Sequence, residues 1–173
     1  LAHTSNRWLV TGHIVYNNKV QPVRQFEPFY SSAFAFESDA VLARYGVATQ
    51  NYYDALGRVH RTDFPNKTFT EVKFSAWDVQ SFDQNDTVDR SLYRVFREFQ
   101  PTTSPERMAL DRSLAHKDTP ESVQLDPLGR EIVVIKTNND GTIRKIEHTY
   151  DINGNVAEIT DARGLKAFQY NRD

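Results

Sequence analysis

Several residue types that often reveal function are missing or scarce in this sequence. It has no cysteine, only seven glycines and seven prolines, and nearly balanced charge, with 21 basic and 23 acidic residues among 173. The absence of cysteine excludes a disulfide framework, a CxxC redox centre and a thiolate zinc site. A formal charge of −2 provides no net basic field to attract nucleic acid or an anionic membrane, so we expect neither as a partner.

Long apolar runs and a signal sequence are also missing. The longest aliphatic run, at 132–135, is far shorter than the ~20 residues that cross a bilayer. The chain starts Leu-Ala-His-Thr, without the charged-then-apolar order of a signal peptide, so we expect no membrane contact by this segment. Hydrophobic residues nevertheless make up 39% and aromatic residues 12%, enough to fold one or two small domains.

Motifs for catalysis or metal binding are absent as well. The five histidines are dispersed without HExxH spacing, and no G-x-S-x-G motif supplies a nucleophilic serine. Two stretches, beginning at Asp83 and Asp151, start like a calcium-binding loop. Both have valine at the sixth position and lack glutamate at the twelfth, so a capped loop and a hairpin turn are favoured instead. We expect no enzyme activity, no metal and no cofactor.

The main positive signal is a D-x-x-G tetrapeptide that occurs four times. Aspartate at the first position of a turn accepts hydrogen bonds from nearby backbone amides, and glycine at the last position tolerates a positive φ, which we expect at Gly57, Gly129 and Gly154. A catalytic role for the aspartates is less favoured, because a structural role repeats and a catalytic role need not. The predicted turn residues and their neighbours are Tyr53, Asp54, Gly57, Arg58, Asp126, Gly129, Arg130, Tyr150, Asp151, Gly154, Asp161, Gly164 and Tyr170.

Residues with high β propensity follow the turns, and the pattern reads strand, turn, strand. It predicts a mainly β fold of stacked antiparallel β-hairpins, in repeats of ~20 to 25 residues that stack because one hairpin cannot bury its apolar face alone. The first repeat covers 51–75 and further repeats cover 123–173, with another beginning at Tyr170. An open sheet edge there leads us to expect self-association. Segment 1–50 is expected to form a hairpin around Asn17 and Asn18 and a short helix at 38–45.

Segment 76–122 interrupts the repeats and is predicted to be a helical insertion. One helix is expected to start near Asp89, and another to start at Ser104 and run to about Lys117. The residues on one face of the first helix are Leu92, Val95, Phe96 and Phe99, and those expected to face inward from the second are Met108, Leu110 and Leu114.

The tyrosines before aspartate allow two interpretations. Exposed rings would form a platform for carbohydrate, whereas rings stacked on one another across neighbouring hairpins would hold the sheet together. The second interpretation is favoured.

The segment from Tyr150 through Gly164 to Tyr170 resembles the YD (Rhs) repeat, and the turns at 53–58 and 126–130 resemble further copies. Asn171, Leu125 and Lys67 depart from the pattern. Other blocks resemble the B component of bacterial insecticidal toxin complexes (Tc toxins), downstream of its propeller. These blocks are 17–19, 25–29, 61–65, 77–88 and 115–120, and the last two are the most discriminating.

This resemblance implies a structural role. In Tc toxins the B and C components wind YD-repeat sheet into a hollow shell that encloses a cytotoxic C-terminal effector, delivered through the pore of the A component. The implied partners are the rest of the shell, the C component with its effector, and the A component, in a secreted or extracellular toxin. The family's self-cleaving aspartate site has no counterpart here. Alternatives are a YD-repeat surface protein that binds glycans or partner cells, and an enzyme of unrecognised type.

Overall fold

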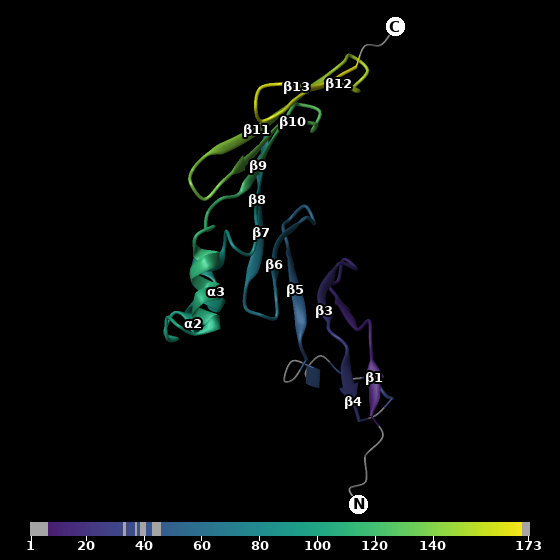
Figure 1. The fold of residues 1–173 in the computed structure, drawn as a ribbon. Helices are drawn as coiled ribbons and strands as arrows, with labels where there is room; N and C mark the ends of the chain where they lie inside the picture. Colours follow the sequence, from purple (N-terminus) through teal and green to yellow (C-terminus); the bar gives the residue numbers. More distant parts are fainter. Residues whose placement is uncertain (1–6, 33, 37, 39–40, 43–45, 171–173) are drawn as a thin grey trace, which may run out of the picture. The chain divides into compact units, whose positions relative to one another are not determined.

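The computed structural model describes residues 7–32, 34–36, 38, 41–42 and 46–170 (Figure 1). The chain divides into two compact units, Leu1–Lys67 and Thr68–Asp173, and each is considered on its own. Antiparallel strands dominate both units, with short helices in between, so the predicted mainly β fold is confirmed. Within the described residues, no helix is both long enough and apolar enough to cross a membrane.

In the part of the N-terminal unit that the structure describes, there are six strands. They are β1 (Trp8–Val10), β2 (Ile14–Tyr16), β3 (Pro22–Phe26), β4 (Phe29–Ser31), β5 (Ala48–Tyr53) and β6 (Val59–Asp63). Antiparallel pairing joins β2 to β3, β3 to β5 and β5 to β6, while β1 pairs separately with β4. The predicted hairpin around Asn17 is therefore confirmed as β2 and β3. Val41 and Leu42 are helical, but the rest of the helix expected at 38–45 lies largely outside the described residues.

The C-terminal unit is an antiparallel meander in which each strand pairs with the next. Its strands are β7 (Phe69–Phe74), β8 (Asp78–Phe82), β9 (Glu121–Leu125), β10 (Glu131–Thr137), β11 (Ile143–Tyr150), β12 (Val156–Thr160) and β13 (Lys166–Gln169). Tight turns join most neighbours, and a longer segment joins β8 to β9. The strand-turn-strand pattern read from the sequence thus predicts this unit well. One difference is that β8 lies within the segment 76–122 that the sequence assigned to helices.

Three short helices lie in the connection between β8 and β9. They are a 3₁₀-helix, η1 (Val88–Arg90), and two α-helices, α2 (Leu92–Arg97) and α3 (Pro105–Leu114). The first α-helix begins later than the expected Asp89, because the Ser91 hydroxyl caps it by accepting from the Arg94 amide. Ser104 caps α3 in the same way, as predicted.

Few side chains of the C-terminal unit are fully buried, because its sheet has a single layer. Phe69 and Phe82 are its buried strand residues among those described, and Val88 and Leu110 are buried where the helices meet the sheet. Of the α3 residues expected to face inward, Leu110 is buried and Leu114 is half-buried. Met108 is 44% exposed, so its predicted inward orientation is wrong.

Candidate functional site

The four D-x-x-G segments form the same hairpin turn. In each turn the glycine amide donates to the aspartate carbonyl at 2.9–3.0 Å, and the aspartate amide donates to the carbonyl of the residue after glycine at 2.8–2.9 Å. The glycine φ angles are +82°, +76°, +83° and +77° at Gly57, Gly129, Gly154 and Gly164, so the expected positive φ is confirmed. This is a three-residue hairpin loop with a glycine bulge, which accounts for the register shifts beside the turns.

The aspartate side chain holds each turn together, as Asp126 illustrates. One carboxylate oxygen accepts from the amides of Leu128 (2.8 Å) and Arg130 (3.0 Å). The other oxygen binds Arg130 Nε at 2.7 Å and Nη2 at 2.6 Å. The Arg130 amide, followed by its guanidinium, lowers the pKa of Asp126 below its usual value. With both oxygens engaged, this carboxylate serves the turn rather than a bound substrate.

Asp54 repeats this arrangement in the N-terminal unit. Its Oδ1 accepts from the amides of Leu56 and Arg58, both at 2.9 Å, and its Oδ2 binds Arg58 Nε and Nη2, both at 2.7 Å. The Arg58 amide is the largest influence that lowers the pKa of Asp54. An arginine directly after the turn glycine is therefore part of the turn.

The other two turns vary in the partner of the second carboxylate oxygen. Asp151 is bound by the amide of Asn155 at 2.8 Å and by its side-chain amide at 3.2 Å. Asp161 is bound by Arg163, which lies inside the turn, through Nε at 2.8 Å and Nη2 at 2.6 Å. These side-chain hydrogen bonds are the largest influence that lowers the pKa of Asp161.

Three further turns share the backbone geometry although their sequences differ from D-x-x-G. In them the amide of the fourth residue donates to the carbonyl of the first at 3.0 Å, and the fourth residue has positive φ. The fourth residues are Val20 (φ 61°), Lys67 (φ 71°) and Gly141 (φ 79°). The sequence indicated turns at these places, but a search for aspartate and glycine missed the shared geometry, because Asn17, Phe64 and Asn138 occupy the first position.

The tyrosine before the turn ties one hairpin to the preceding one. In the C-terminal unit the Tyr150 hydroxyl donates to the Glu131 carbonyl at 2.8 Å. In the N-terminal unit the Tyr53 hydroxyl donates to the Pro22 carbonyl at 2.9 Å. Glu131 lies two residues beyond Gly129 and Pro22 lies two residues beyond Val20, which are the positive-φ residues in the turns of the β9–β10 and β2–β3 hairpins, so the same rule operates in both units. Tyr170, before the last predicted repeat, is 52% exposed, and its amide donates to Ala157 O at 2.9 Å.

In two cases the residue after a turn also reaches a turn further along the chain, at the same end of the strands. The Arg130 guanidinium lies 4.4 Å from the Tyr150 ring centroid, in cation–π geometry, and its Nη1 is close to Gly154. In the N-terminal unit, Gln21 Nε2 donates to the Gly57 carbonyl at 3.0 Å. The expected stacking of tyrosine on tyrosine is not what holds these hairpins together. In the described residues a hydroxyl-to-carbonyl bond and the residue after the turn perform this role.

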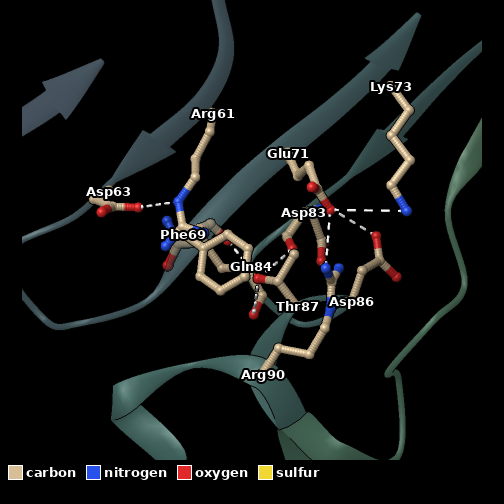
Figure 2. Close-up of polar contacts among 10 residues, drawn as sticks. All are labelled: Arg61, Asp63, Phe69, Glu71, Lys73, Asp83, Gln84, Asp86, Thr87 and Arg90. Carbon is tan, nitrogen blue, oxygen red and sulfur yellow. Dashed lines mark hydrogen bonds and ion pairs between the residues drawn. The ribbon is translucent and has the colours of Figure 1, made fainter. Parts of the chain in front are cut away.

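A second polar cluster fixes the helical connection between β8 and β9. Asp86 is only 5% exposed, and its Oδ1 accepts from the amide and hydroxyl of Thr119, both at 2.9 Å. Its Oδ2 accepts from the Asp83 amide at 2.7 Å (Figure 2). The blocks 77–88 and 115–120 are distant in sequence, and this carboxylate joins them where the connection leaves and re-enters the sheet.

Neighbouring side chains attach the same connection to the face of the sheet. The fully buried Thr87 donates its hydroxyl to the Phe69 carbonyl. Arg90 forms an ion pair with Glu71 at 3.0 Å, and its guanidinium lies 5.5 Å from the Phe69 ring centroid (Figure 2). The same guanidinium lies 5.8 Å from the ring centroid of Phe82. These contacts hold the start of the helices against β7 and β8.

Acidic residues near this cluster do not form a metal site. Within the described part of the chain, no group of three histidine or acidic residues is arranged to hold an ion. In the stretch that resembles a calcium loop, Asp83 Oδ1 accepts from the amides of Asn85 (2.7 Å) and Asp86 (2.9 Å), which confirms the predicted capped loop. A groove of about 600 Å³ beside it contains Glu121 and Lys136, which pair with each other at 2.8 Å.

The fourth turn position offers a reciprocal test. Val20 has φ 61° and is 78% exposed, while nothing lies within 4 Å of a Cβ placed on Gly129. Val20→Gly relieves backbone strain without losing packing, so we expect it to raise the free energy of unfolding by about 1 kcal/mol. Gly129→Val should lower it by about 1–3 kcal/mol. Urea denaturation measures both values. A destabilised V20G, or an unchanged G129V, would contradict the shared geometry.

The lowered pKa of Asp126 predicts a pH dependence. A carboxyl whose pKa is lower in the folded state stabilises the fold above its unfolded pKa, ~3.9, and loses this contribution as pH falls through the folded value. We therefore expect Asp126→Asn to lower Tm at neutral pH, and the difference from the unmodified protein to shrink below about pH 4. Thermal unfolding across pH measures this. A difference that stays constant with pH would show that the negative charge of Asp126 contributes nothing to stability.

Removing the Asp86 carboxylate should release the helical connection. Asp86→Ala removes a buried carboxylate that accepts from the amides of Asp83 and Thr119, so we expect a loss of about 3 kcal/mol and faster proteolysis within 88–117. Asp111→Ala is the matched control, because Asp111 forms an exposed ion pair with Arg107 and should change stability by less than about 0.5 kcal/mol. Equal effects of the two substitutions would refute the role given to Asp86.

Comparison with known proteins finds this fold in Tc toxins. No protein-family model matches the sequence, and no curated protein matches it. Among solved structures, a TcdB2-TccC3-Cdc42 crystal structure is 25% identical, with a TM-score of 0.75 over 91% of this chain and 7% of that chain. The Photorhabdus luminescens Tc holotoxin pore with a TccC3 mutation is 26% identical, with a TM-score of 0.75 over 94% of this chain and 7% of that chain.

A TcdB2-TccC3 crystal structure is also 26% identical, with a TM-score of 0.72 over 91% of this chain and 7% of that chain. The present chain therefore spans about 7% of the length of the chains that it matches. It has the fold of a short segment of these Tc toxin complexes.

Proposed function

We propose that this chain is a segment of the hollow YD-repeat shell of a Tc-type toxin, and that the shell encloses a cytotoxic C-terminal effector. The observation that carries the proposal is the linkage between successive hairpins, in which Tyr150 binds the Glu131 carbonyl and Arg130 contacts the Tyr150 ring. Such links allow a single-layered sheet to extend hairpin by hairpin. The likeness to TcdB2-TccC3 complexes supports the toxin assignment.

The segment would act as a passive wall without catalysis of its own. Asp54 and Asp126 are engaged within their turns, which supports a structural role for both carboxylates. Its partners would be the remainder of the shell, the toxin C component with its effector, and the pore-forming A component. The likeness to a Tc holotoxin pore supports this set of partners and a site of action outside the producing cell.

Glycan recognition by the tyrosines is the less supported alternative. The hydroxyls of Tyr53 and Tyr150 donate to backbone carbonyls and both rings are half-buried, which leaves them poorly placed as a stacking platform. A glycan array with the full-length protein would distinguish the two functions, because a passive wall has no saturable sugar binding.

Protection of the effector from protease tests the proposed function. The full-length polypeptide that contains this segment is co-expressed with its C component and treated with proteinase K. We expect the effector to remain intact, and to be digested in the double variant Asp126→Ala with Arg130→Ala, which opens a turn in the wall. Lys145→Ala, at an exposed ion pair with Glu147, is the control and should keep the effector protected. Rapid digestion of the effector in the unmodified complex would refute encapsulation.

A further inference from the structure

Helix α2 presents its apolar side chains to solvent. Phe96 is 61% exposed and Phe99, just beyond the helix, is 83% exposed. Exposure is similar for the other members of this surface, which we name the α2–α3 apolar face. Its residues are Leu92, Val95, Phe96, Phe99 and Met108, with exposed fractions between 44% and 83%. A helix in a folded unit normally turns this stripe toward the core.

The arginines of α2 show that this orientation is fixed by specific contacts. Arg94 binds Glu98 at 3.0 Å and the Asp89 carbonyl at 3.3 Å. The Arg97 guanidinium lies 3.8 Å from the Tyr93 ring centroid. These charged side chains are half-buried or engaged locally, while the apolar ones project outward. The unit gains nothing from this arrangement by itself, because the apolar area stays in water.

The helices that carry the α2–α3 apolar face are held in place by specific contacts. Helices α2 and α3 lie side by side (Figure 1) and contact η1. Asp86 joins both ends of the connection, and Arg107 of α3 donates to the Glu98 carbonyl. An apolar face on a preorganised support loses little entropy when it is covered, which is typical of an interface.

We propose that the α2–α3 apolar face packs against another segment of the same long polypeptide, and thereby joins separate parts of the shell wall. This inference rests on the proposed function. The matched chains are many times longer than this one, since this chain covers 7% of them. A neighbouring wall segment in the same polypeptide would be present at high effective concentration. An apolar patch on that segment would suit the aromatic and aliphatic side chains of this face.

The solved structures show whether a fold of this kind is present with and without the hypervariable C-terminal region. The matches cover 91–94% of this chain, which leaves at most about 16 of the 173 residues unmatched. The helical connection 88–117 contains more residues than that, so part of this connection is matched in each structure. The TM-score is 0.72 for TcdB2-TccC3 and also 0.72 for TcdB2-TccC3 without its hypervariable C-terminal region. The matched fold is therefore present in both structures, and this is why we choose a wall segment rather than the effector as the occupant of the α2–α3 apolar face.

Site-specific cross-linking in the full-length complex tests this inference. The photoreactive residue p-benzoylphenylalanine replaces Phe96, and mass spectrometry identifies the peptide that it captures. We expect a peptide of the same polypeptide from outside residues 1–173. Capture of the C component, the effector or a second copy would overturn the inference, and so would the absence of any cross-link. The same probe at Arg112, an exposed polar position on α3, is the matched control and should capture much less.

A second variant keeps the test independent of cross-linking chemistry. Phe96→Glu with Phe99→Glu should leave the fold of this unit intact, because both side chains are exposed, but should speed hydrogen exchange of amides 92–99 in the full-length protein. Unchanged exchange would overturn the inference. The two proposals can fail separately. If the intramolecular cross-link forms but the protease digests the effector, only encapsulation is refuted. If the effector is protected but the cross-link does not form, only the packing of the α2–α3 apolar face is refuted.

Discussion

The structure depends on one interaction, the aspartate carboxylate that closes a hairpin turn by accepting backbone amides. At Asp126 and Asp54 one oxygen accepts two amides while the other binds an arginine four residues later. Amide donors that would otherwise point to water are satisfied locally, and the following glycine takes a positive φ at no steric cost. Each turn therefore fixes the register of the two strands that leave it.

Turns alone do not make a sheet, because separate hairpins must also be aligned with one another. Tyr150 binds the Glu131 carbonyl of the preceding hairpin, and Arg130 lies against Tyr150. In the N-terminal unit, Tyr53 and Gln21 make the equivalent contacts. A single-layered sheet has little buried core to choose among neighbours, so these polar contacts at the strand ends supply the specificity.

The helical connection follows a different principle from the repeats. Buried Asp86 ties its two ends together, and Arg90 attaches it to Phe69, Phe82 and Glu71 of the sheet. Its outer surface is apolar and uncovered within this unit. A repeating sheet has few surface features that distinguish one part of it from another, and the helical connection gives this unit such a feature.

The sequence by itself determined the β-hairpins of the repeats, the four D-x-x-G turns and the start of α3 at the Ser104 cap, because each depends on contacts within a few residues. The repeat pattern already places Lys67 at the position of a turn glycine, but the sequence did not reveal that Val20 takes such a position, since nothing in its residue type favours positive φ. Only the tertiary structure decided that Asp86 meets Thr119, that Tyr150 binds Glu131, and that the apolar stripe of α2 faces outward. These contacts join residues far apart in sequence, and such pairing depends on how the whole sheet assembles.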